Sequence, residues 1–165
     1  MLPVSGTCSC IFGYCLVIFD LRFLFSRMLE LLRKLQYRGT ETFVHYQLPT
    51  DLFNGFSEMG LPLLSLEQAS KEDLQFVLAF VLSKAEIDSV FEKILPFLQP
   101  DSIVWFCFPK GSSKKYQVDI NRDKGWEFLK SKDFLPVRIV SIDGDWSGLR
   151  FRHRQLVSAI TRKFT

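Results

Sequence analysis

The sequence has few of the side chains that usually hold metal ions. Its 165 residues include two histidines and four cysteines. Three of the cysteines, Cys8, Cys10 and Cys15, follow a C-x-C-x4-C pattern, whereas structural zinc sites use C-x2-C pairs completed by further Cys or His ligands. We therefore predict no metal site. Nothing in this cysteine usage requires an oxidising compartment, so the predicted location is cytoplasmic.

The common catalytic and phosphate-binding motifs are also missing. There is no G-x-S-x-G nucleophile turn and no G-x4-G-K-[ST] phosphate loop. The run DINRD imitates the start of a calcium loop, but Lys124 stands where that loop needs Gly and Lys130 where it needs Glu. His45 and His153 both lie in strand-like patterns, where packing is the simpler role. We predict no catalytic residue and no bound cofactor.

No uncharged apolar stretch is convincing as a membrane span. Residues 2–19 carry no charge, but they include Pro3, Gly6 and Gly13 and are too polar at their start. Residues 1–10 also lack the Lys or Arg of a secretory signal. This leaves the amino terminus without a recognised targeting role.

A regular pattern begins at the second methionine, Met28. Three leucines then repeat at helical spacing, with Ser26 as a possible N-cap. These leucines are Leu29, Leu32 and Leu35. We predict that residues 1–27 are an extension outside the core, which a wrongly assigned start would explain, and that residues 28–165 form a single α/β domain. A membrane-associating helix in residues 1–27 is the alternative.

Core-forming residues are abundant, since 47% of the chain is hydrophobic and 17 residues are Phe. This composition and length are typical of one globular domain. A nearly continuous apolar run at 74–82 and an unbroken one at 103–108 flank an amphipathic helix predicted over 84–98, which indicates a βαβ crossover between buried parallel strands. The other predicted strands are 42–47, 61–66, 137–142 and 149–154, and the other predicted helices are 51–58 and a helix from Asn121 or Asp123 to 132.

The last predicted strand, LRFRHR at 149–154, alternates apolar and basic side chains. Arg150, Arg152 and Arg154 share one face, which we interpret as the solvent side of an antiparallel edge strand. The Asp-Gly-Asp run at 143–145 predicts the turn before it. Together these elements predict an α/β three-layer sandwich, with a mostly parallel Rossmann-like sheet that ends in an antiparallel hairpin.

Glycine is missing from the turn after the first predicted strand. Open parallel sheets bind ligands beyond the carboxyl ends of their strands. Dinucleotide and methyl-donor binders place a glycine-rich turn there, so that backbone N–H groups can approach the cofactor. This chain has LPTDLFNG instead, with Pro49 and no G-x-G. The cradle for such a cofactor is absent.

Charge is distributed unevenly along the chain. Residues 1–37, 38–100 and 101–165 carry net charges of +2, −5 and +6. The basic last part suits an anionic partner, although the sequence pI of 8.7 lies below the ~9 typical of nucleic-acid-binding domains.

The candidate anion site lies at the carboxyl edge of the predicted sheet, beside a helix N-terminus expected near Asn121. Its residues are Lys110, Ser112, Arg122 and Asp143. The alternative is that Asp143 pairs with Arg122 or Lys110 and that the group is purely structural.

Three motifs in the second half of the chain occur in a fixed order: W-x-x-x-P-K, D-x-N-R-D and S-I-D-x-x-W-S-x-L-R-F. From about Leu31 onward the chain resembles a family of small bacterial proteins catalogued only as a domain of unknown function. The matching residues that we expect to be structural are Trp105, Pro109, Asp119, Asn121, Asp123, Trp146, Ser147 and Arg150. The resemblance implies a Rossmann-like fold shaped like a trimmed methyltransferase, and no established activity.

Three functions fit these observations. The leading hypothesis is a non-catalytic binding or interaction module, for an anionic small molecule or a protein partner. One alternative is a degenerate enzyme that uses S-adenosylmethionine or a nucleotide, which the missing glycine turn disfavours. The other is a weak nucleic-acid binder.

Overall fold

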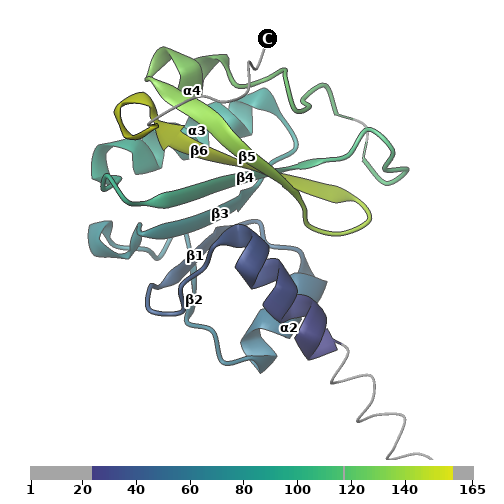
Figure 1. The fold of residues 1–165 in the computed structure, drawn as a ribbon. Helices are drawn as coiled ribbons and strands as arrows, with labels where there is room; N and C mark the ends of the chain where they lie inside the picture. Colours follow the sequence, from purple (N-terminus) through teal and green to yellow (C-terminus); the bar gives the residue numbers. More distant parts are fainter. Residues whose placement is uncertain (1–23, 117, 158–165) are drawn as a thin grey trace, which may run out of the picture.

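The computed structural model describes residues 24–116 and 118–157, and its core is a six-stranded sheet in the order β2-β1-β3-β4-β6-β5 (Figure 1). Strands β1 to β4 are parallel, β6 is antiparallel to β4, and β5 is antiparallel to β6. The strands are β1 (Phe43–Tyr46), β2 (Leu63–Ser65), β3 (Phe76–Phe80), β4 (Ile103–Pro109), β5 (Phe134–Ser141) and β6 (Trp146–His153). The predicted mostly parallel α/β sheet with a final antiparallel hairpin is confirmed.

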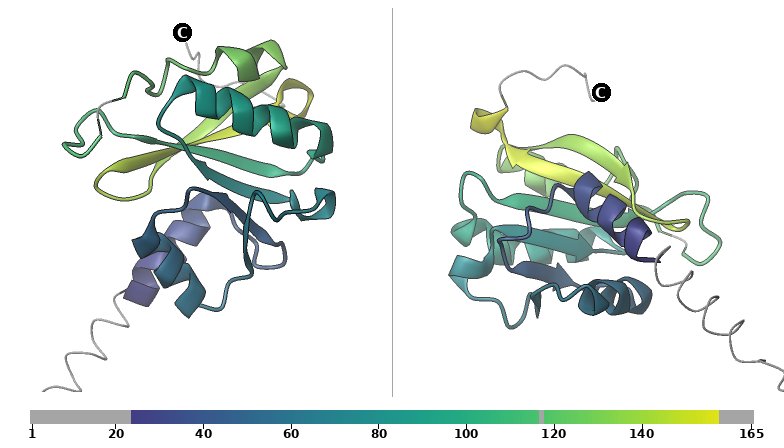
Figure 2. Two further views of the ribbon diagram at one scale, coloured as in Figure 1. Left: turned by 180° about the vertical axis from the view of Figure 1, so that it is seen from behind. Right: turned by 60° about the horizontal axis from the view of Figure 1, so that its bottom comes forward.

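Helices cover both faces of this sheet (Figure 2). They are the N-terminal helix (residues 24–35), α2 (Thr50–Glu58), α3 (Lys84–Ile94), α4 (Glu127–Ser131) and three short 3-10 turns, η1 (Lys71–Asp73), η2 (Leu95–Phe97) and η3 (Arg154–Leu156). The N-terminal helix and α2 share one buried cluster with Trp105, whereas α3 and α4 share another with Trp126. The three layers predicted from the sequence are therefore present.

Strands β3 and β4 lie in the middle of the sheet and are buried on both faces. In β4, Val104 and Phe106 point into the cluster under α3, while Trp105 and Cys107 point into the cluster under the N-terminal helix. This explains why their sequences are unbroken apolar runs. The crossover helix α3 begins as predicted at its Ser83 cap, whose Oγ accepts a hydrogen bond from Glu86 N at 3.3 Å.

The N-terminal helix differs from its prediction. Residues 24–27 are already helical, so Ser26 lies inside the helix and does not cap it. Leu29 is 43% exposed, whereas Met28 is buried. The buried face consists of Met28, Leu31, Leu32 and Leu35. Residues 1–23, which make up most of the predicted extension 1–27, lie outside the described residues. Over the part of the chain that is described, no helix is long and apolar enough to cross a membrane.

The prediction that residues 149–154 form an edge strand is wrong. Strand β6 lies between β4 and β5, and β5 is the edge. The alternation of apolar and basic side chains in a sequence indicates which face of a strand is polar. It does not indicate whether the strand has one neighbour in the sheet or two. Arg150 is consequently half-buried rather than on an open margin.

The predicted helix start at Asn121 is also wrong, because α4 begins at Glu127. Asn121 Oδ1 accepts hydrogen bonds from the backbone N–H groups of Asp123 at 2.9 Å and Lys124 at 3.0 Å. Asn can form such a local turn as readily as it can cap a helix. Gly125 follows with φ +109°, a conformation that a helix cannot include. The expected helix N-terminus is therefore absent from this position.

Candidate functional site

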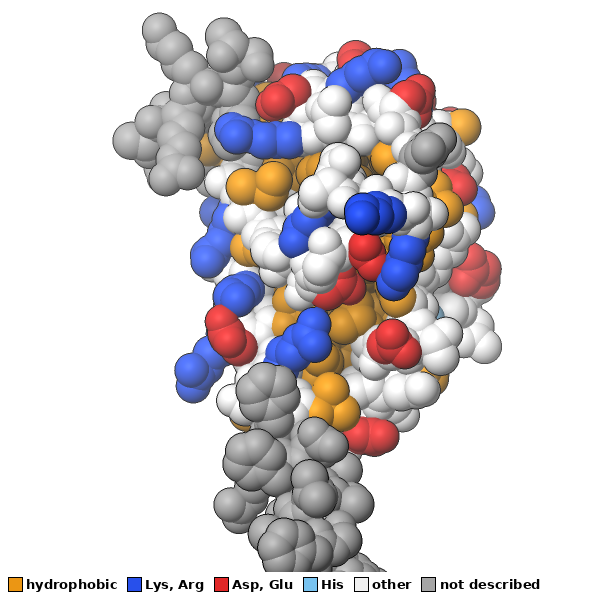
Figure 3. Space-filling model, turned by 90° about the vertical axis from the view of Figure 1, so that its right-hand side faces the viewer, with side chains coloured by type: hydrophobic (Ala, Val, Ile, Leu, Met, Phe, Trp, Pro, Cys, Tyr) orange, Lys and Arg blue, Asp and Glu red, His pale blue; other side chains and the backbone are white. Residues whose placement is uncertain are grey.

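The carboxyl ends of β1, β3 and β4 meet at one edge of the sheet. In open parallel sheets this is the edge where ligands bind. Figure 3 faces this edge and shows basic and acidic side chains mixed around exposed hydrophobic ones. The candidate site is therefore built from the loops that follow these strands.

The turn after β1 carries side chains where cofactor-binding sheets carry glycines. Gln47 adopts φ +50°, Leu48 packs on the adjacent apolar cluster, and Pro49 precedes α2. Proline has no N–H to donate, and Leu48 occupies space with its side chain. The backbone of this turn therefore cannot present the row of open N–H groups that a glycine turn offers.

The loop after β4 is fastened to the turn between β5 and β6. Lys110 Nζ donates hydrogen bonds to Ser141 Oγ, at 2.9 Å, and to the carbonyl oxygen of Asp143. The backbone N–H of Lys110 donates to the carbonyl oxygen of Asp145 at 2.7 Å. We call this set of contacts the clasp. Its residues are Lys110, Ser113, Lys115, Ser141, Asp143 and Asp145.

The two carboxylates of the clasp have different partners. Asp143 Oδ1 accepts hydrogen bonds from the backbone N–H groups of Asp145 at 2.8 Å and Trp146 at 2.7 Å, so it closes its own turn. Asp145 accepts from Ser113 Oγ at 2.8 Å and pairs with Lys115 Nζ at 2.9 Å. The Lys115 ammonium and the Ser113 hydroxyl lower the pKa of Asp145.

A hollow of about 690 Å³ opens beside the clasp. It is lined by Pro109, Lys110, Gly111, Ser113, Tyr116, Val118, Asp119, Ile120 and Asn121. Of the predicted anion site, the structure brings together Lys110 and Asp143, through the Asp143 carbonyl rather than its carboxylate. Ser112 and Arg122 are exposed and do not line the hollow, and Arg122 Nε lies 3.7 Å from the Asp123 carboxylate. The four-residue anion site stays a prediction.

Other residues of the three sequence motifs have packing roles. The Trp146 ring packs edge-on against Phe80, with ring centres 4.9 Å apart, and lies 5.0 Å from the Tyr116 ring. Ser147 pairs with Phe108 across β6 and β4, and Pro109 pairs with Trp146. These contacts hold the end of β4 against the start of β6.

Sequence reasoning missed a basic surface at the other end of the sheet. Arg150 lies opposite Arg138 in the β5–β6 register, and a hollow next to it is lined by Arg33 and Arg38. The alternation in LRFRHR places Arg150 and Arg152 on one face. No sequence signal brings Arg33 on the N-terminal helix and Arg38 after it to the same place.

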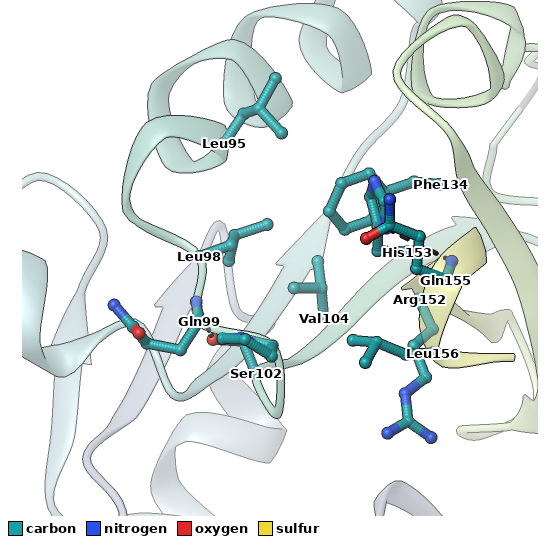
Figure 4. A pocket seen from close by; sticks show the side chains of 11 residues that line it. Leu95, Leu98, Gln99, Ser102, Val104, Phe134, Arg152, His153, Gln155 and Leu156 are labelled. Atoms are coloured by element: carbon teal, nitrogen blue, oxygen red, sulfur yellow. Dashed lines mark hydrogen bonds between the residues drawn. The ribbon is translucent and has the colours of Figure 1, made fainter.

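A more apolar cavity of about 300 Å³ lies near the start of β4 (Figure 4). Its apolar lining comes from Leu95, Leu98, Pro100, Val104, Phe134 and Leu156. Two of its polar side chains are engaged within the protein: Ser102 Oγ donates to the Leu74 carbonyl at 2.8 Å, and His153 Nδ1 accepts from Gln155 N at 3.4 Å. Among the described residues, no carboxylate or cysteine lines the cavity, and its candidates for an acid, base or nucleophile are His153 and Ser102.

Metal chemistry finds no support in the described ranges, where no group of three or more His, Cys, Asp or Glu side chains could hold an ion. Cys107 is buried, and burial raises the pKa of its thiol. A thiol of this kind is a packing residue rather than a nucleophile.

Comparison with known proteins finds no matching family model and no matching curated protein. Similar solved structures include the tRNA methyltransferase TrmK of B. subtilis, at 10% identity, 74% coverage of this chain, 64% of that chain and a TM-score of 0.47. A protein of the NADB-Rossmann superfamily from Streptococcus agalactiae is similar at 12% identity, with coverages of 77% and 67% and a TM-score of 0.45. The N-methyltransferase NodS from Bradyrhizobium japonicum is similar at 12% identity, with 78% of this chain and 94% of that chain covered and a TM-score of 0.46. The chain thus spans less than two thirds of TrmK, and these similarities concern the Rossmann-like α/β fold alone.

Proposed function

We propose that this protein is a non-catalytic binding module that takes an anionic small molecule in the hollow at the carboxyl end of β4. The Lys110 ammonium carries the proposal. It has three N–H donors, and its two acceptors in the structure, Ser141 Oγ and the Asp143 carbonyl, are both uncharged. No carboxylate of the described residues lies within ion-pair distance of Lys110. One N–H donor of the ammonium is left for a ligand, and its positive charge, which also acts on the Asp145 carboxylate, favours an anion.

The surroundings of Lys110 favour a small ligand over an extended polyanion. Ser113 and Asn121 add neutral hydrogen-bonding groups to the lining, but Asp119 adds a carboxylate. An extended polyanion would meet this carboxylate, whereas a molecule with one anionic group and a polar body need not. The clasp holds Lys110 in place before a ligand arrives, which lowers the cost of ordering the site on binding.

The hollow has few of the groups that usually carry acid–base or nucleophilic catalysis. Among the described residues of its lining there is no His, Cys or Glu, and the one carboxylate, Asp119, is exposed. Binding without chemistry is the role that this set of side chains supports.

A thermal-shift screen of the full chain against sugar phosphates, nucleotides and carboxylic acids, at constant ionic strength, tests the proposal. A ligand at 100 times its Kd adds about 2.7 kcal/mol of stability. Calorimetry on the best ligand then compares three variants. Lys110→Met should abolish binding, whereas the matched change Lys114→Met should not. Ser141→Ala loosens the clasp but should retain binding, because the Lys110 ammonium is still present. A screen without any stabilising ligand, or full affinity in Lys110→Met, would contradict the proposal.

A second candidate is a degenerate enzyme that uses S-adenosylmethionine or a nucleotide, and Glu67 favours it. This exposed carboxylate follows the end of β2 by two residues. In dinucleotide-binding sheets an acidic residue about 20 residues beyond the first turn accepts the ribose hydroxyls. Glu67 also acts on His45 in the neighbouring strand β1, where burial lowers the histidine pKa and Glu67 opposes that shift.

Calorimetry with S-adenosylmethionine and S-adenosylhomocysteine distinguishes the two candidates. Binding that weakens in Glu67→Gln and persists in Lys110→Met would favour the enzyme. Absence of binding at millimolar concentration would exclude it, in agreement with the side chains that fill the turn after β1.

A further inference from the structure

A second hollow, of about 340 Å³, lies at the opposite end of β4 from Lys110. It is lined by Arg33, Gln36, Tyr37, Arg38, Ile103 and Arg150. We infer that this hollow is a binding site for a compact phosphate-type oxyanion, such as phosphate, pyrophosphate or the terminal phosphates of a small molecule. The inference does not depend on the proposed function, because it uses different residues.

The site belongs to a larger group of basic side chains, which we call the arginine cluster. It consists of Arg33, Arg38, Arg138, Arg150 and Arg152. Strand pairing assembles part of it, since Arg150 pairs with Trp105 of β4 on one side and with Arg138 of β5 on the other. Trp105 donates its indole N–H to the Leu35 carbonyl, so this face of the sheet is the one beneath the N-terminal helix.

Negative charge is scarce around the arginine cluster. Within the described chain, no carboxylate lies at ion-pair distance from Arg138, Arg150 or Arg152, and the same holds for Arg33. Arg38 does have an acidic partner, the buried Glu41, whose Oε1 lies 3.9 Å from Arg38 Nε and whose Oε2 has no hydrogen-bond partner. Like charges that face each other across a strand pair destabilise a sheet. The pair Arg138 and Arg150 is such a case, and a bound anion would remove the repulsion.

Arg150 shows this excess of positive charge over acidic partners most clearly. Burial and the charges of Arg152, Arg138 and Arg38 lower the pKa of Arg150. One end of its guanidinium donates to Gln36 Oε1, but the Nε–H group is buried and has no acceptor. Buried donors are nearly always satisfied in native proteins, so an unpaired one beside a basic hollow is the signature of a missing acceptor.

The shape and chemistry of the hollow select a phosphate-type group. Arg33, Arg38 and Arg150 line this one small hollow, and a guanidinium carries five N–H donors, of which Arg150 uses one on Gln36. A carboxylate has two oxygens, which one guanidinium can satisfy, whereas phosphate and pyrophosphate have enough oxygens for several bidentate contacts.

The hollow offers no platform for nucleic-acid bases. Its one aromatic residue, Tyr37, packs edge-on against Phe43 and Phe76, with ring centres 5.3 and 5.1 Å apart. The Tyr37 hydroxyl donates to the Glu41 carbonyl at 2.7 Å. Proteins that bind single strands rely on exposed aromatic rings for stacking. A discrete oxyanion therefore fits this hollow better than an RNA or DNA strand does.

This hollow is separate from the one beside Lys110. Ile103 begins β4 and Pro109 ends it. At about 3.3 Å per residue, the two ends of this strand lie roughly 20 Å apart. A single small molecule cannot occupy both hollows, so variants at each end report on each site separately.

The test is calorimetric titration of the full chain with sodium pyrophosphate, with sodium chloride holding the ionic strength constant. Arg150→Met and Arg38→Met should each weaken pyrophosphate binding by about tenfold or more, the loss expected for one charge-assisted hydrogen bond. Lys93→Met, which removes one charge from the exposed last turn of α3, is the matched control and should change the affinity less than about twofold, as expected of a distant surface charge.

A second readout keeps the test decisive if a variant folds poorly. At one fixed concentration, pyrophosphate should raise the thermal midpoint of the wild type and of Lys93→Met clearly more than that of Arg38→Met, whose side chain is largely exposed and whose fold should persist. Equal losses in all three variants, Arg150→Met, Arg38→Met and Lys93→Met, would show a non-specific charge effect and overturn the proposal. Binding that persists in both arginine variants would overturn it too, as would binding of oligonucleotides without binding of pyrophosphate.

Discussion

The indole Nε1 of Trp105 donates a hydrogen bond to the carbonyl oxygen of Leu35 at 2.9 Å. Trp105 is fully buried in the middle of β4, and Leu35 is the last residue of the N-terminal helix. Carbonyl groups in the last turn of a helix have no partner within the helix. The bond therefore satisfies one of these carbonyls and fixes the helix against the centre of the sheet.

Removal of the Trp105 side chain should destabilise the whole domain. Trp105→Ala should cost about 3–5 kcal/mol in chemical denaturation, because it leaves a large cavity under the N-terminal helix. Trp105→Phe keeps most of the ring but leaves the Leu35 carbonyl unpaired, at a cost of about 1–3 kcal/mol.

Hydrogen exchange separates the local effect of Trp105→Phe from a general loss of stability. Amide protection should fall first in residues 24–35. The matched variant Trp126→Phe breaks the bond from Trp126 Nε1 to the Asn121 carbonyl on the opposite face and should not loosen that helix preferentially. A cost below about 1 kcal/mol for Trp105→Ala would mean that β4 is not the packed centre of the sheet.

A chain that starts at Met28 should fold as well as the full chain. Residues 24–27 are exposed, whereas Met28 is buried and its Sδ lies 3.1 Å from where a side chain at Gly55 would begin. The free energy of unfolding should change by less than about 1 kcal/mol on truncation, as for other surface segments. Met28→Ala in the full chain should cost about 2–5 kcal/mol by leaving a cavity. A truncation loss above about 2 kcal/mol would place residues 1–27 in the stabilising core.

Gly125 should not tolerate a side chain. A Cβ atom there would lie 2.8 Å from Ile120 Cγ2, and the backbone adopts φ +109°. Gly125→Ala should therefore destabilise the protein by about 2 kcal/mol or more, through steric contact and backbone strain together. Gly144→Ala is the control, since nothing lies within 4 Å of its Cβ position and its φ is not in the left-handed region. Equal stability of the two variants in urea would contradict this account of the loop before α4.

The clasp should make part of the free energy of unfolding depend on pH in the acidic range. The folded-state pKa of Asp145 lies below its ordinary value of 3.8, chiefly because of Lys115 and Ser113. A lowered folded-state pKa gives stability that is present above the unfolded-state pKa and is lost as the pH falls through the folded-state value. The difference in unfolding free energy between wild type and Asp145→Asn should thus be present at pH 6 and shrink below pH ~4.

Lys115→Met should reduce the same acid-dependent difference, because Lys115 is its main cause. The double variant should show no more than the larger single effect, since the two residues act as one pair. A difference between wild type and Asp145→Asn that is constant from pH 6 to pH 3 would show that the pair does not favour ionised Asp145.

Some features of this fold follow from short stretches of sequence. The apolar run at 103–108 predicts a strand buried on both faces, and Ser83 predicts the start of α3, because each depends on residues close together in the chain. The missing glycine in the turn after β1 is equally local. It limits what the carboxyl edge can bind, because side chains in that turn keep a cofactor away from the backbone N–H groups.

Other local patterns are ambiguous because one residue type serves two conformations. Asn121 can cap a helix or close a turn on its own, and the positive φ of Gly125 determines which of these occurs. Leu29 and Met28 are both apolar, and the contact of Met28 with Gly55 on α2 determines which of them is buried. In each case a neighbour in space resolves what the sequence leaves open.

The sequence alone determined the α/β class, the central buried strands and the alternation that puts Arg150 and Arg152 on one face. Only the tertiary structure decided that β6 inserts between β4 and β5, which places Arg138 opposite Arg150 and brings Arg33 and Arg38 to the same hollow. The physical reason is that periodicity is set by the geometry of one strand, whereas strand order and the meeting of distant charges depend on how all the elements bury their apolar faces together.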